Sequence, residues 1–439
     1  MDEKIQPQAK AEPSKAFFIE MLTRDLTLSD CVLDLVDNSI HTLISETELD
    51  VSEHLFAGTR AQKVKGLIDI SFTPSKFNIK DNCGGISLSD AEDRVFLLGN
   101  PVREKENAGL GVFGIGMKRA VFKIGKQISI ASHTTEEEFG IDINVDTWQK
   151  SPHWYFPFTY ANKKKSKDGG TEIQVSRLNP TVAEQFSSKS FKAILIEKTS
   201  RVYALFQKAG VQIKINGNDS TADIPELAET KGLRTVRHLL KKDGVDILIM
   251  AGLSPVTDRT PRGWYIFLNG RMVLDADKTE RTGWGSDSQP AFHSKYNHFL
   301  GYVYFRSKDV QKLPWTTTKE GVNRESTIYQ AALAEMRLLS RPVLDFLNTL
   351  YTDVKEQSEP EHALFQKARP VAPQKIASRS NTVFKADVTK ESEDTLVSIQ
   401  YKRPRKKIRK IKEFLGRSSM SAYRVGEYTF DWFFDRNCK

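Results

Sequence analysis

The amino-acid sequence predicts a mixed α/β protein with two folded domains and a small basic helical segment at its end. Residues 14–190 mix helical and strand patterns with several glycine-rich loops, and residues 191–352 form a second mixed segment. At roughly 150 residues per domain, a chain of 439 residues has room for two or three hydrophobic cores. Its 39% hydrophobic and 10% aromatic residues exclude a chain that is disordered throughout.

Cysteine usage and the start of the chain exclude further classes of protein. The three cysteines, Cys31, Cys83 and Cys438, are odd in number and far apart, so neither a disulfide framework nor a cysteine zinc site is expected. Residues 1–15 are polar and do not form a secretion signal, and residues 1–13 are expected to be disordered. No apolar run approaches the roughly 18 residues that a spanning helix needs. We therefore expect a cytoplasmic protein without a membrane partner.

The first element that carries candidate functional residues is a helix over residues 30–44. Its apolar residues recur at helical spacing, which indicates one buried face. Asp34 and Asn38 are four residues apart and so project from the same side of the helix. A carboxylate there can orient or deprotonate a water molecule, and an amide oxygen can ligate Mg²⁺, which prefers oxygen.

Two strand motifs carry the next candidates. The alternating strand over residues 77–81 ends in Asp81 and is followed by a glycine turn. A carboxylate at that place can accept the exocyclic amino proton of adenine, while Gly85 lets the backbone approach the base. Further on, Thr171 follows two glycines at the start of a strand, where its hydroxyl can support an adenine-bound water or Asp81.

A glycine-rich loop over residues 109–120 leads into a helical pattern, which is typical of a phosphate cradle at a helix N-terminus. It is not a Rossmann motif, because the charged residues 103–108 before it do not form a strand. It is not a P-loop either, because Met117 occupies the place of the required lysine and no Ser or Thr follows Lys118. A different nucleotide-binding role is the better interpretation.

Residues 191–439 are predicted to contain a second mixed domain, a linker and a small helical module. Strands are predicted over residues 211–216, 245–251, 263–269 and 300–305, and a long amphipathic helix over 326–350. Residues 353–395 are polar, contain prolines and are predicted to be a linker. Residues 396–439 hold a basic run and then an aromatic-rich end, which together predict a small helical module.

The positive charge lies in this tail. Residues 401–439 contain twelve Lys or Arg and four Asp or Glu, a net charge of +8 out of +9 for the whole chain. Such a run is typical of phosphate contacts with nucleic acid, but also of a solvated linker or a nuclear-import signal. The candidate nucleic-acid contacts are Lys402, Arg403, Arg405, Lys406, Lys407, Arg409 and Lys410.

Taken in order, the four motifs resemble those of the GHKL ATPase superfamily, which includes gyrase B, heat-shock chaperones, sensor histidine kinases and MutL. The similarity is greatest to the MutL- and MORC-like branch. Residues 33–40 (LDLVDNSI) resemble its E-L-V-E-N-S box, 81–86 (DNCGGI) its adenine motif, and 113–118 (FGIGMK) its phosphate loop. The resemblance implies a Bergerat ATP-binding fold, an α+β two-layer sandwich, over residues 14–190. It also implies a ribosomal-protein-like α/β transducer domain over 191–352.

The resemblance also implies roles for single residues. Asp34 is expected to be the general base and Asn38 the Mg²⁺ ligand, and Asp81 is expected to bind adenine with Gly85 and Thr171. A lid is expected over residues 95–112, and Lys319 in the loop 313–320 is expected to reach the γ-phosphate. The expected phosphate-binding residues are Gly111, Gly114, Gly116, Met117 and Lys118. Asp34 stands where Glu is usual, so slow hydrolysis is expected.

The implied function is a Mg²⁺-dependent ATPase that forms a homodimeric clamp when ATP binds. The basic tail and the resemblance favour DNA as its target, and the resemblance alone suggests a restriction or phage-defence system. The alternative is a chaperone-like or scaffolding ATPase that recruits a protein partner through its aromatic C-terminal end. A third possibility is a nucleotide-binding module without turnover, because Asp34 replaces Glu.

Overall fold

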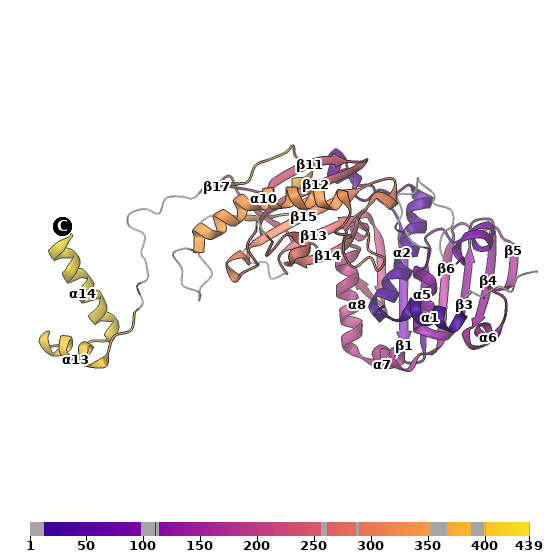
Figure 1. Ribbon diagram of the computed structural model, residues 1–439, viewed down its shortest axis with the longest axis horizontal. Coiled ribbons are helices and arrows are strands. Elements are labelled where there is room, and N and C mark those ends of the chain that lie inside the picture. The colour runs from indigo at the N-terminus through magenta and orange to yellow at the C-terminus, as the bar shows by residue number, and fades with distance from the viewer. Residues whose placement is uncertain are drawn as a thin grey trace, which may run out of the picture. The chain divides into compact units, whose positions relative to one another are not determined.

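The computed structural model describes residues 13–97, 110, 114–255, 261–286, 289–351, 367–387, 399 and 401–438. The chain divides into two compact units, Met1–Asp387 and Val388–Lys439. The first unit contains both large sheets, and Figure 1 shows the strands of each sheet with their neighbouring helices. Residues 1–12 of the predicted disordered stretch 1–13, and most of the predicted lid, lie outside the described residues.

The first sheet has the strand order β5-β4-β3-β6-β2-β1-β7-β8. Its neighbouring strands are antiparallel except for β1 and β7, which are parallel. Buried and exposed residues alternate along β1, so one face of the sheet is covered and the other faces solvent. The strands are β1 (Gly66–Thr73), β2 (Lys76–Asp81), β3 (Gly125–His133), β4 (Glu137–Asn144), β5 (Phe158–Lys163), β6 (Gly170–Leu178), β7 (Val211–Ile215) and β8 (Asn218–Ser220).

Helices pack against the covered face and bury its apolar residues in a common core. This two-layer arrangement of helices on one sheet agrees with the predicted α/β class. The helices of this domain are α1 (Lys15–Thr23), α2 (Leu28–Thr47), α3 (Glu53–Ala57), α4 (Leu88–Asp90), η1 (Ala91–Val95), α5 (Gly116–Ile124), α6 (Val145–Lys150), α7 (Pro180–Ser187), α8 (Lys189–Val202) and α9 (Ala204–Ala209).

Helix α2 begins with a reciprocal cap that the sequence encodes locally. The Thr27 side chain accepts from the backbone N–H of Asp30, and the Asp30 carboxylate accepts from the backbone N–H of Thr27. The helix ends at Thr47, and the C-cap residue Glu48 adopts a left-handed conformation with φ +50°. The predicted helix over residues 30–44 is therefore confirmed, and most of its residues are buried.

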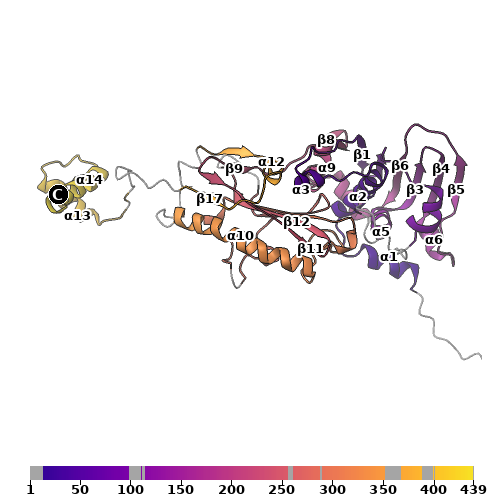
Figure 2. The same cartoon turned by 90° about the horizontal axis from the view of Figure 1, so that it is seen from above.

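The second sheet has the order β11-β12-β15-β13-β14. Its central strands are buried along nearly their whole length, so both faces are covered. Helix α10 lies along one face, as Figure 2 shows from above. The predicted strands over 245–251, 263–269 and 300–305 and the predicted long helix are all observed. The elements are β11 (Val236–Lys242), β12 (Val245–Leu253), β13 (Trp264–Leu268), β14 (Arg271–Asp277), η2 (Glu280–Thr282), η3 (Ser294–Tyr296), β15 (Phe299–Arg306), η4 (Val310–Lys312) and α10 (Thr327–Tyr351).

The structure corrects the predicted boundary between the two domains at residue 190. Strand β7, which the predicted boundary places in the second segment, pairs in parallel with β1 of the first sheet. Ile213 and Ile215 on this strand are buried in the core of the first domain. The first domain therefore continues to β8, which ends at Ser220. A strand's own alternation does not reveal which sheet it joins, because partner choice depends on contacts far away in the sequence.

The predicted linker over residues 353–395 is corrected for its described middle part. There the chain returns to the second domain through two short antiparallel strand pairs, β16 with β9 and β17 with β10. Between them lies a short helix with Ile376 and Ala377 fully buried. These pairings use backbone groups, so a polar, proline-containing sequence can form them. The elements are β9 (Leu227–Glu229), β10 (Leu233–Arg234), β16 (Arg369–Val371), α12 (Pro373–Ala377) and β17 (Lys385–Ala386).

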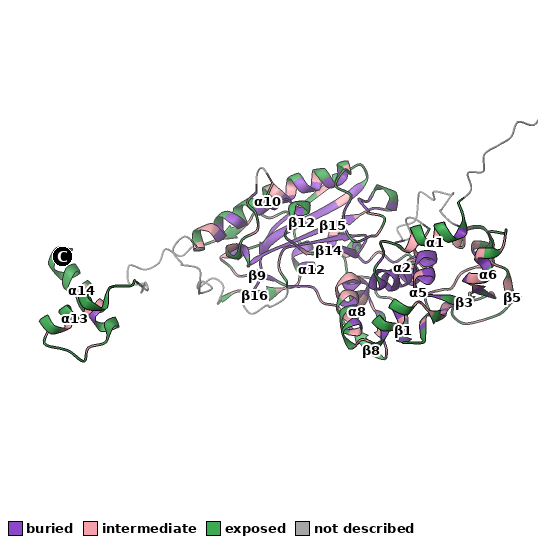
Figure 3. Cartoon of the chain, turned by 60° about the horizontal axis from the view of Figure 1, so that its bottom comes forward, coloured by how far each residue is buried: buried purple, intermediate pink, exposed green. Residues whose placement is uncertain are grey.

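The second unit contains helices α13 (Arg405–Phe414) and α14 (Ala422–Asn437). Val425 is buried in this unit, whereas Phe414 is 90% exposed. Figure 3 shows both helices mostly in the colour of exposed residues. Among the described residues of the chain, none of the helices combines the length and the apolar character needed to cross a membrane.

Candidate active site

Helix α2 brings the Asp34 carboxylate against the start of helix α5. Arg119 donates from Nε to Oδ2 of Asp34 at 2.6 Å and from Nη2 to Oδ1 at 3.0 Å. Both side chains are buried. Burial raises the pKa of Asp34, while the hydrogen bonds and charge of Arg119 oppose that shift. A Cβ atom at Gly116 would lie 3.4 Å from Cγ of Asp34, so this carboxylate directly faces the first residue of α5.

Asn38 follows Asp34 by one helical turn, as the spacing predicts. Its amide nitrogen is buried and has no hydrogen-bond partner among the residues that the structure describes. An unpaired buried amide is costly unless a ligand satisfies it. The amide nitrogen of Asn38 is therefore available as a donor to a ligand beside the Asp34 carboxylate.

Asp81 stands at the end of strand β2 with three hydrogen bonds to its carboxylate. Oδ2 accepts from Oγ of Ser39 at 2.6 Å, and Oδ1 accepts from the backbone N–H groups of Cys83 at 2.9 Å and Thr171 at 3.3 Å. Burial raises the pKa of Asp81, while these donors oppose the shift. A carboxylate has about four acceptor positions, so roughly one remains for an external donor such as an amino group.

The glycines around Asp81 are required by close backbone packing. Gly85 has φ +79°, and a Cβ atom there would lie 1.9 Å from the carbonyl oxygen of His133. At Gly170 a Cβ atom would lie 2.2 Å from the carbonyl oxygen of Asp81. These two glycines let the turn after β2 pack against β3 and β6. The space left by the missing side chain of Gly85 is filled by protein backbone, not by an open approach to a base.

Thr171 contacts Asp81 through its backbone. Its N–H donates to Asp81, whereas its hydroxyl lies 2.9 Å from Oγ of Ser132. Ser132 in turn accepts from the backbone N–H of Ile86 at 2.8 Å. Sequence reasoning named Thr171 but missed Ser132 and Ser39. Ser39 lies directly after Asn38 in the sequence, whereas nothing near Ser132 in the sequence points to this site.

At the other end of the site, Gly114 adopts φ +64° and Gly116 begins helix α5. The buried amine of Lys118 donates to the carbonyl oxygen of Val95 at 2.8 Å and also to those of Leu97 and Gly114. Burial lowers the pKa of Lys118 to about 8. Three carbonyl acceptors match the three N–H groups of an ammonium, so the charged form fits this position at neutral pH.

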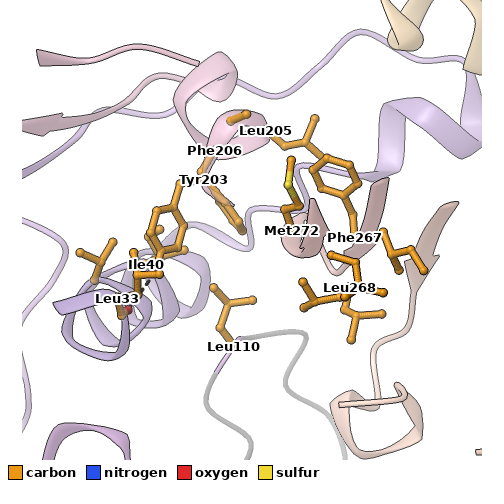
Figure 4. Close-up of a cluster of buried hydrophobic side chains, with 14 of the residues drawn as sticks. Leu33, Ile40, Leu110, Tyr203, Leu205, Phe206, Phe267, Leu268 and Met272 are labelled. Atoms are coloured by element: carbon orange, nitrogen blue, oxygen red, sulfur yellow. Dashed lines mark hydrogen bonds between the residues drawn. The ribbon is translucent and has the colours of Figure 1, made fainter. Parts of the chain in front are cut away.

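Two further residues of the predicted phosphate loop are Met117 and Gly111, and their roles stay predictions. Met117 is buried in the core beside Lys118. Gly111 lies outside the described residues, as does most of the predicted lid over 95–112. Leu110, from that segment, is fully buried. In Figure 4 it lies between helix α2, with Leu33 and Ile40, and the second-domain residues Leu268 and Met272.

Lys319 reaches helix α2 from the second domain. Its backbone has φ +56°, and its Nζ donates to Oδ2 of Asp37 at 2.9 Å. Asp37 also accepts from Nε of Arg271 at 2.8 Å and from the hydroxyl of Tyr203 at 2.8 Å. Burial alone would raise the pKa of Asp37, but the charges of Arg271 and Lys319 outweigh it and lower that pKa. Sequence reasoning found Lys319 and missed the three residues around it.

The seven basic residues proposed for nucleic-acid contact lie on helix α13 or just before it, and all are exposed. They belong to the second unit.

Residues 26–171 match the family model of histidine kinase-, DNA gyrase B- and HSP90-like ATPases. No curated protein was found to match the chain. The matched residues contain the Asp34 helix, the Asp81 strand, the glycine loop and Thr171, and they end before β7 and β8 of the same sheet. This part of the chain is therefore similar to a GHKL-type ATPase domain, which suggests that it binds ATP.

Proposed function

We propose that the protein binds Mg²⁺-ATP and hydrolyses it to ADP and phosphate, with Asp34 as the general base. The observation that carries the proposal is the position of Asp34 and Asn38. They share one side of α2, and Asp34 directly faces the start of α5. The N-terminus of a helix favours phosphate, because its free N–H groups and the helix dipole attract negative charge. A carboxylate at that place is suited to orient a water molecule that attacks a phosphate.

Asp81 is the proposed adenine-binding residue. Its carboxylate is held by donors from three different segments, and an acceptor position remains for the exocyclic amino group. Adenine and guanine differ in the group at that edge, so this contact would select ATP over GTP. The proposed phosphate-binding residues are Gly111, Gly114, Gly116, Met117 and Lys118.

The side chains beside Asp34 fit a magnesium ion. The oxygen of the Asn38 amide is the type of ligand that Mg²⁺ prefers, and its nitrogen, which has no partner among the described residues, can donate to a phosphate oxygen. Mg²⁺ commonly takes only one or two protein ligands, with phosphate and water oxygens completing its shell. When bound, the ion would neutralise phosphate charge. Asn38 is therefore the proposed ligand, and Asp34 keeps its own role towards water.

Lys319 is the proposed contact to the γ-phosphate. Its amine donates to Asp37, three residues after Asp34 on the same helix, and this position supports the proposal. Arg271 also pairs with Asp37, so that carboxylate keeps a cationic partner when the lysine changes partner. A Lys319→Met variant is expected to lose about 10- to 100-fold in hydrolysis rate and to discriminate less between ATP and ADP.

The test of the proposal combines calorimetry with a phosphate-release assay on the full chain. The expected results are ATP binding that requires Mg²⁺ for full affinity, and slow release of phosphate. Asp34→Asn is expected to lower the release rate by at least about 100-fold while ATP still binds. No heat on mixing with ATP and Mg²⁺ would overturn the proposal. ATP binding without phosphate release would favour a nucleotide-binding module without turnover.

We further propose that the nucleotide gates a homodimeric clamp on DNA, of the MutL- or MORC-like branch and within a restriction or phage-defence system. The net charge of +8 over residues 401–439 and the exposed basic side chains of α13 support nucleic acid as the target. DNA affinity is expected to fall steeply with salt and to be lost when residues 401–439 are deleted. Ultracentrifugation with a slowly hydrolysed ATP analogue would test dimer formation.

The alternative function is a chaperone-like or scaffolding ATPase that recruits a protein through its tail. It is favoured by the aromatic side chains of α14, of which Trp432 is 51% and Phe433 58% exposed. Large exposed apolar patches commonly mark interaction sites. Retention of a protein partner by residues 401–439, together with no DNA retention by the full chain, would select this alternative.

A further inference from the structure

One buried arginine contacts the Asp34 carboxylate directly and lies just after the phosphate-loop motif of residues 113–118. Arg119 lies on helix α5, directly after Lys118, and only 6% of its surface is exposed. Its guanidinium makes two hydrogen bonds to Asp34, and its Nη1 donates to the carbonyl oxygen of Thr317 at 3.3 Å. Thr317 is two residues before Lys319, in the loop that the second domain sends to this site.

We propose that Arg119 is a positioning residue for ATP hydrolysis, which holds the Asp34 carboxylate in one orientation and links it to the loop of Lys319. This inference rests on the proposed function, because it assigns Asp34 the role of general base. The proposal concerns how that base is oriented and kept ionised, and it adds a residue just after the phosphate-loop motif.

The geometry of the pair fixes the plane of the carboxylate. Two adjacent N–H groups of the guanidinium meet the two oxygens of Asp34, at 2.6 Å and 3.0 Å. This fork-to-fork arrangement sets both the direction and the rotation of the acceptor group. Each oxygen retains a further acceptor position, so a water molecule can still be bound and oriented. A lysine amine supplies a point charge and cannot impose the same plane.

The charges around Asp34 explain why such a partner is needed. Burial and the neighbouring carboxylate of Asp37 favour the protonated form of Asp34, whereas Arg119 and Lys319 favour the ionised form. Arg271 and Tyr203 also face this group of charges from the second domain and from the α8–α9 connection. Since Lys319 and Arg271 are both bonded to Asp37, Arg119 is the cation whose side chain is bonded to Asp34 itself. Without it, a larger fraction of Asp34 would be protonated at neutral pH, and a protonated carboxyl cannot accept a proton from water.

The third contact connects the base to the other domain. Nη1 of Arg119 donates to the carbonyl oxygen of Thr317, and Lys319, two residues later in the same loop, donates from its amine to Asp37 of α2. A shift of that loop when Lys319 changes partner would therefore alter one of the contacts that hold the guanidinium. The orientation of the base would then depend on the position of the second domain's loop.

The test uses the full chain with Arg119→Lys and Arg119→Gln, and Arg379→Gln as the matched control. Arg379 also pairs with a carboxylate, that of Glu229, but lies on the surface of the second domain. Arg119→Gln is expected to lower kcat by at least about 100-fold, with the ATP dissociation constant changed by less than roughly threefold. Arg119→Lys is expected to retain part of the rate. The control is expected to leave kcat unchanged.

The pH profile distinguishes positioning from a structural role. Loss of the arginine charge raises the pKa of Asp34, so the rise of kcat with pH should move to higher pH by about one unit or more. In the Asp34→Asn background, Arg119→Gln is expected to have no further effect on kcat. Arg119→Lys measured alone decides the matter if Arg119→Gln does not fold. A normal profile with a normal kcat in Arg119→Lys, or additive losses in the double variant, would overturn the inference.

The outcome also separates this inference from the proposed function. If the unchanged protein binds ATP and releases phosphate but the Arg119 variants behave like the control, only the role of Arg119 is wrong. If the unchanged protein releases no phosphate at all, the proposed hydrolysis is wrong and the role of Arg119 is overturned with it.

Discussion

The two ends of the candidate site are built in different ways. At the end proposed to bind adenine (the adenine end), Asp81 receives hydrogen bonds from Ser39, Cys83 and Thr171, and the surrounding turns are held by direct backbone contacts. At the end proposed to bind phosphate (the phosphate end), the Lys118 amine is bonded to backbone carbonyls, and the Asn38 amide nitrogen has no partner in the described part of the chain.

The difference in hydrogen bonding between the two ends indicates which contacts are formed before a nucleotide binds. The adenine end is preorganised, since its acceptor is already fixed by the packing of β2, β3 and β6. At the phosphate end, the Lys118 amine is bonded to backbone carbonyl oxygens. A bound phosphate must either displace these carbonyl partners or add a further contact to the amine. We therefore expect changes at the adenine end to weaken ATP and ADP equally, and changes at the phosphate end to depend on charge and pH.

The largest effect, on both stability and ATP binding, is expected when a side chain is added at Gly85. Gly85→Ala places a methyl group 1.9 Å from the His133 carbonyl oxygen at φ +79°, so the turn after β2 must move. We expect a loss of about 3 kcal/mol or more in unfolding free energy, together with loss of ATP binding. Urea denaturation and calorimetry measure both effects.

The matched control for Gly85 is Gly217→Ala. Gly217 has φ +76° and nothing within 4 Å of the added Cβ, so only the backbone conformation is penalised. A loss of roughly 1 kcal/mol with normal ATP binding is expected. Equal losses in the two variants would mean that the adenine end is not held by close backbone packing.

The next largest effect, on nucleotide affinity, is expected from changing the Asp81 carboxylate. Asp81→Asn replaces one carboxylate oxygen by an NH₂ group. Only one side-chain oxygen then remains to accept from the donors around this position. We expect the affinities for ATP and ADP to fall by the same factor, about 100-fold, because hydrogen bonds to a charged group contribute roughly 1.5–3 kcal/mol. Calorimetry with both nucleotides measures this, and Asp142→Asn on the exposed side of β4 is the control. A loss confined to ATP would contradict the comparison.

At the phosphate end, a pH dependence is expected from Lys118. Burial places the pKa of its amine at about 8. Bound phosphate favours the charged amine, so nucleotide affinity should be constant below pH 8 and fall above it, by up to about tenfold per pH unit. Titrations in buffers with different ionisation enthalpies should show proton uptake on binding above pH 8. Lys118→Arg, which stays charged, should lose this proton uptake, and uptake that persists in the variant would assign it to another group.

The smallest effect on nucleotide affinity is expected from removing the Ser39 hydroxyl, which donates to the Asp81 carboxylate. Ser39→Ala removes the hydrogen bond of 2.6 Å to Oδ2 of Asp81 but leaves both backbone donors in place. We expect nucleotide affinity to fall about fivefold, which corresponds to roughly 1 kcal/mol for one hydrogen bond. Ser45→Ala, on the exposed part of the same helix, is the control and should leave affinity unchanged. An effect as large as that of Asp81→Asn would mean that Ser39 itself contacts the nucleotide.

The sequence alone determined the features that depend on short spacing. Helical periodicity with a capping box at Thr27 and Asp30 predicts α2, and the i, i+4 relation places Asp34 and Asn38 on one side of it. Alternation ended by a glycine turn predicts the strand that carries Asp81. These patterns arise from backbone geometry over a few residues, so they can be recognised without knowing the rest of the fold.

Only the tertiary structure decided the partners of those residues. Arg119 pairs with Asp34 across 85 positions of the sequence, and Arg271 pairs with Asp37 across 234. The same is true of β7, which joins the first sheet, and of β16 and β17, which return to the second domain. No local pattern encodes such contacts, because they depend on how whole elements pack and on which distant backbone or charged group remains to be satisfied.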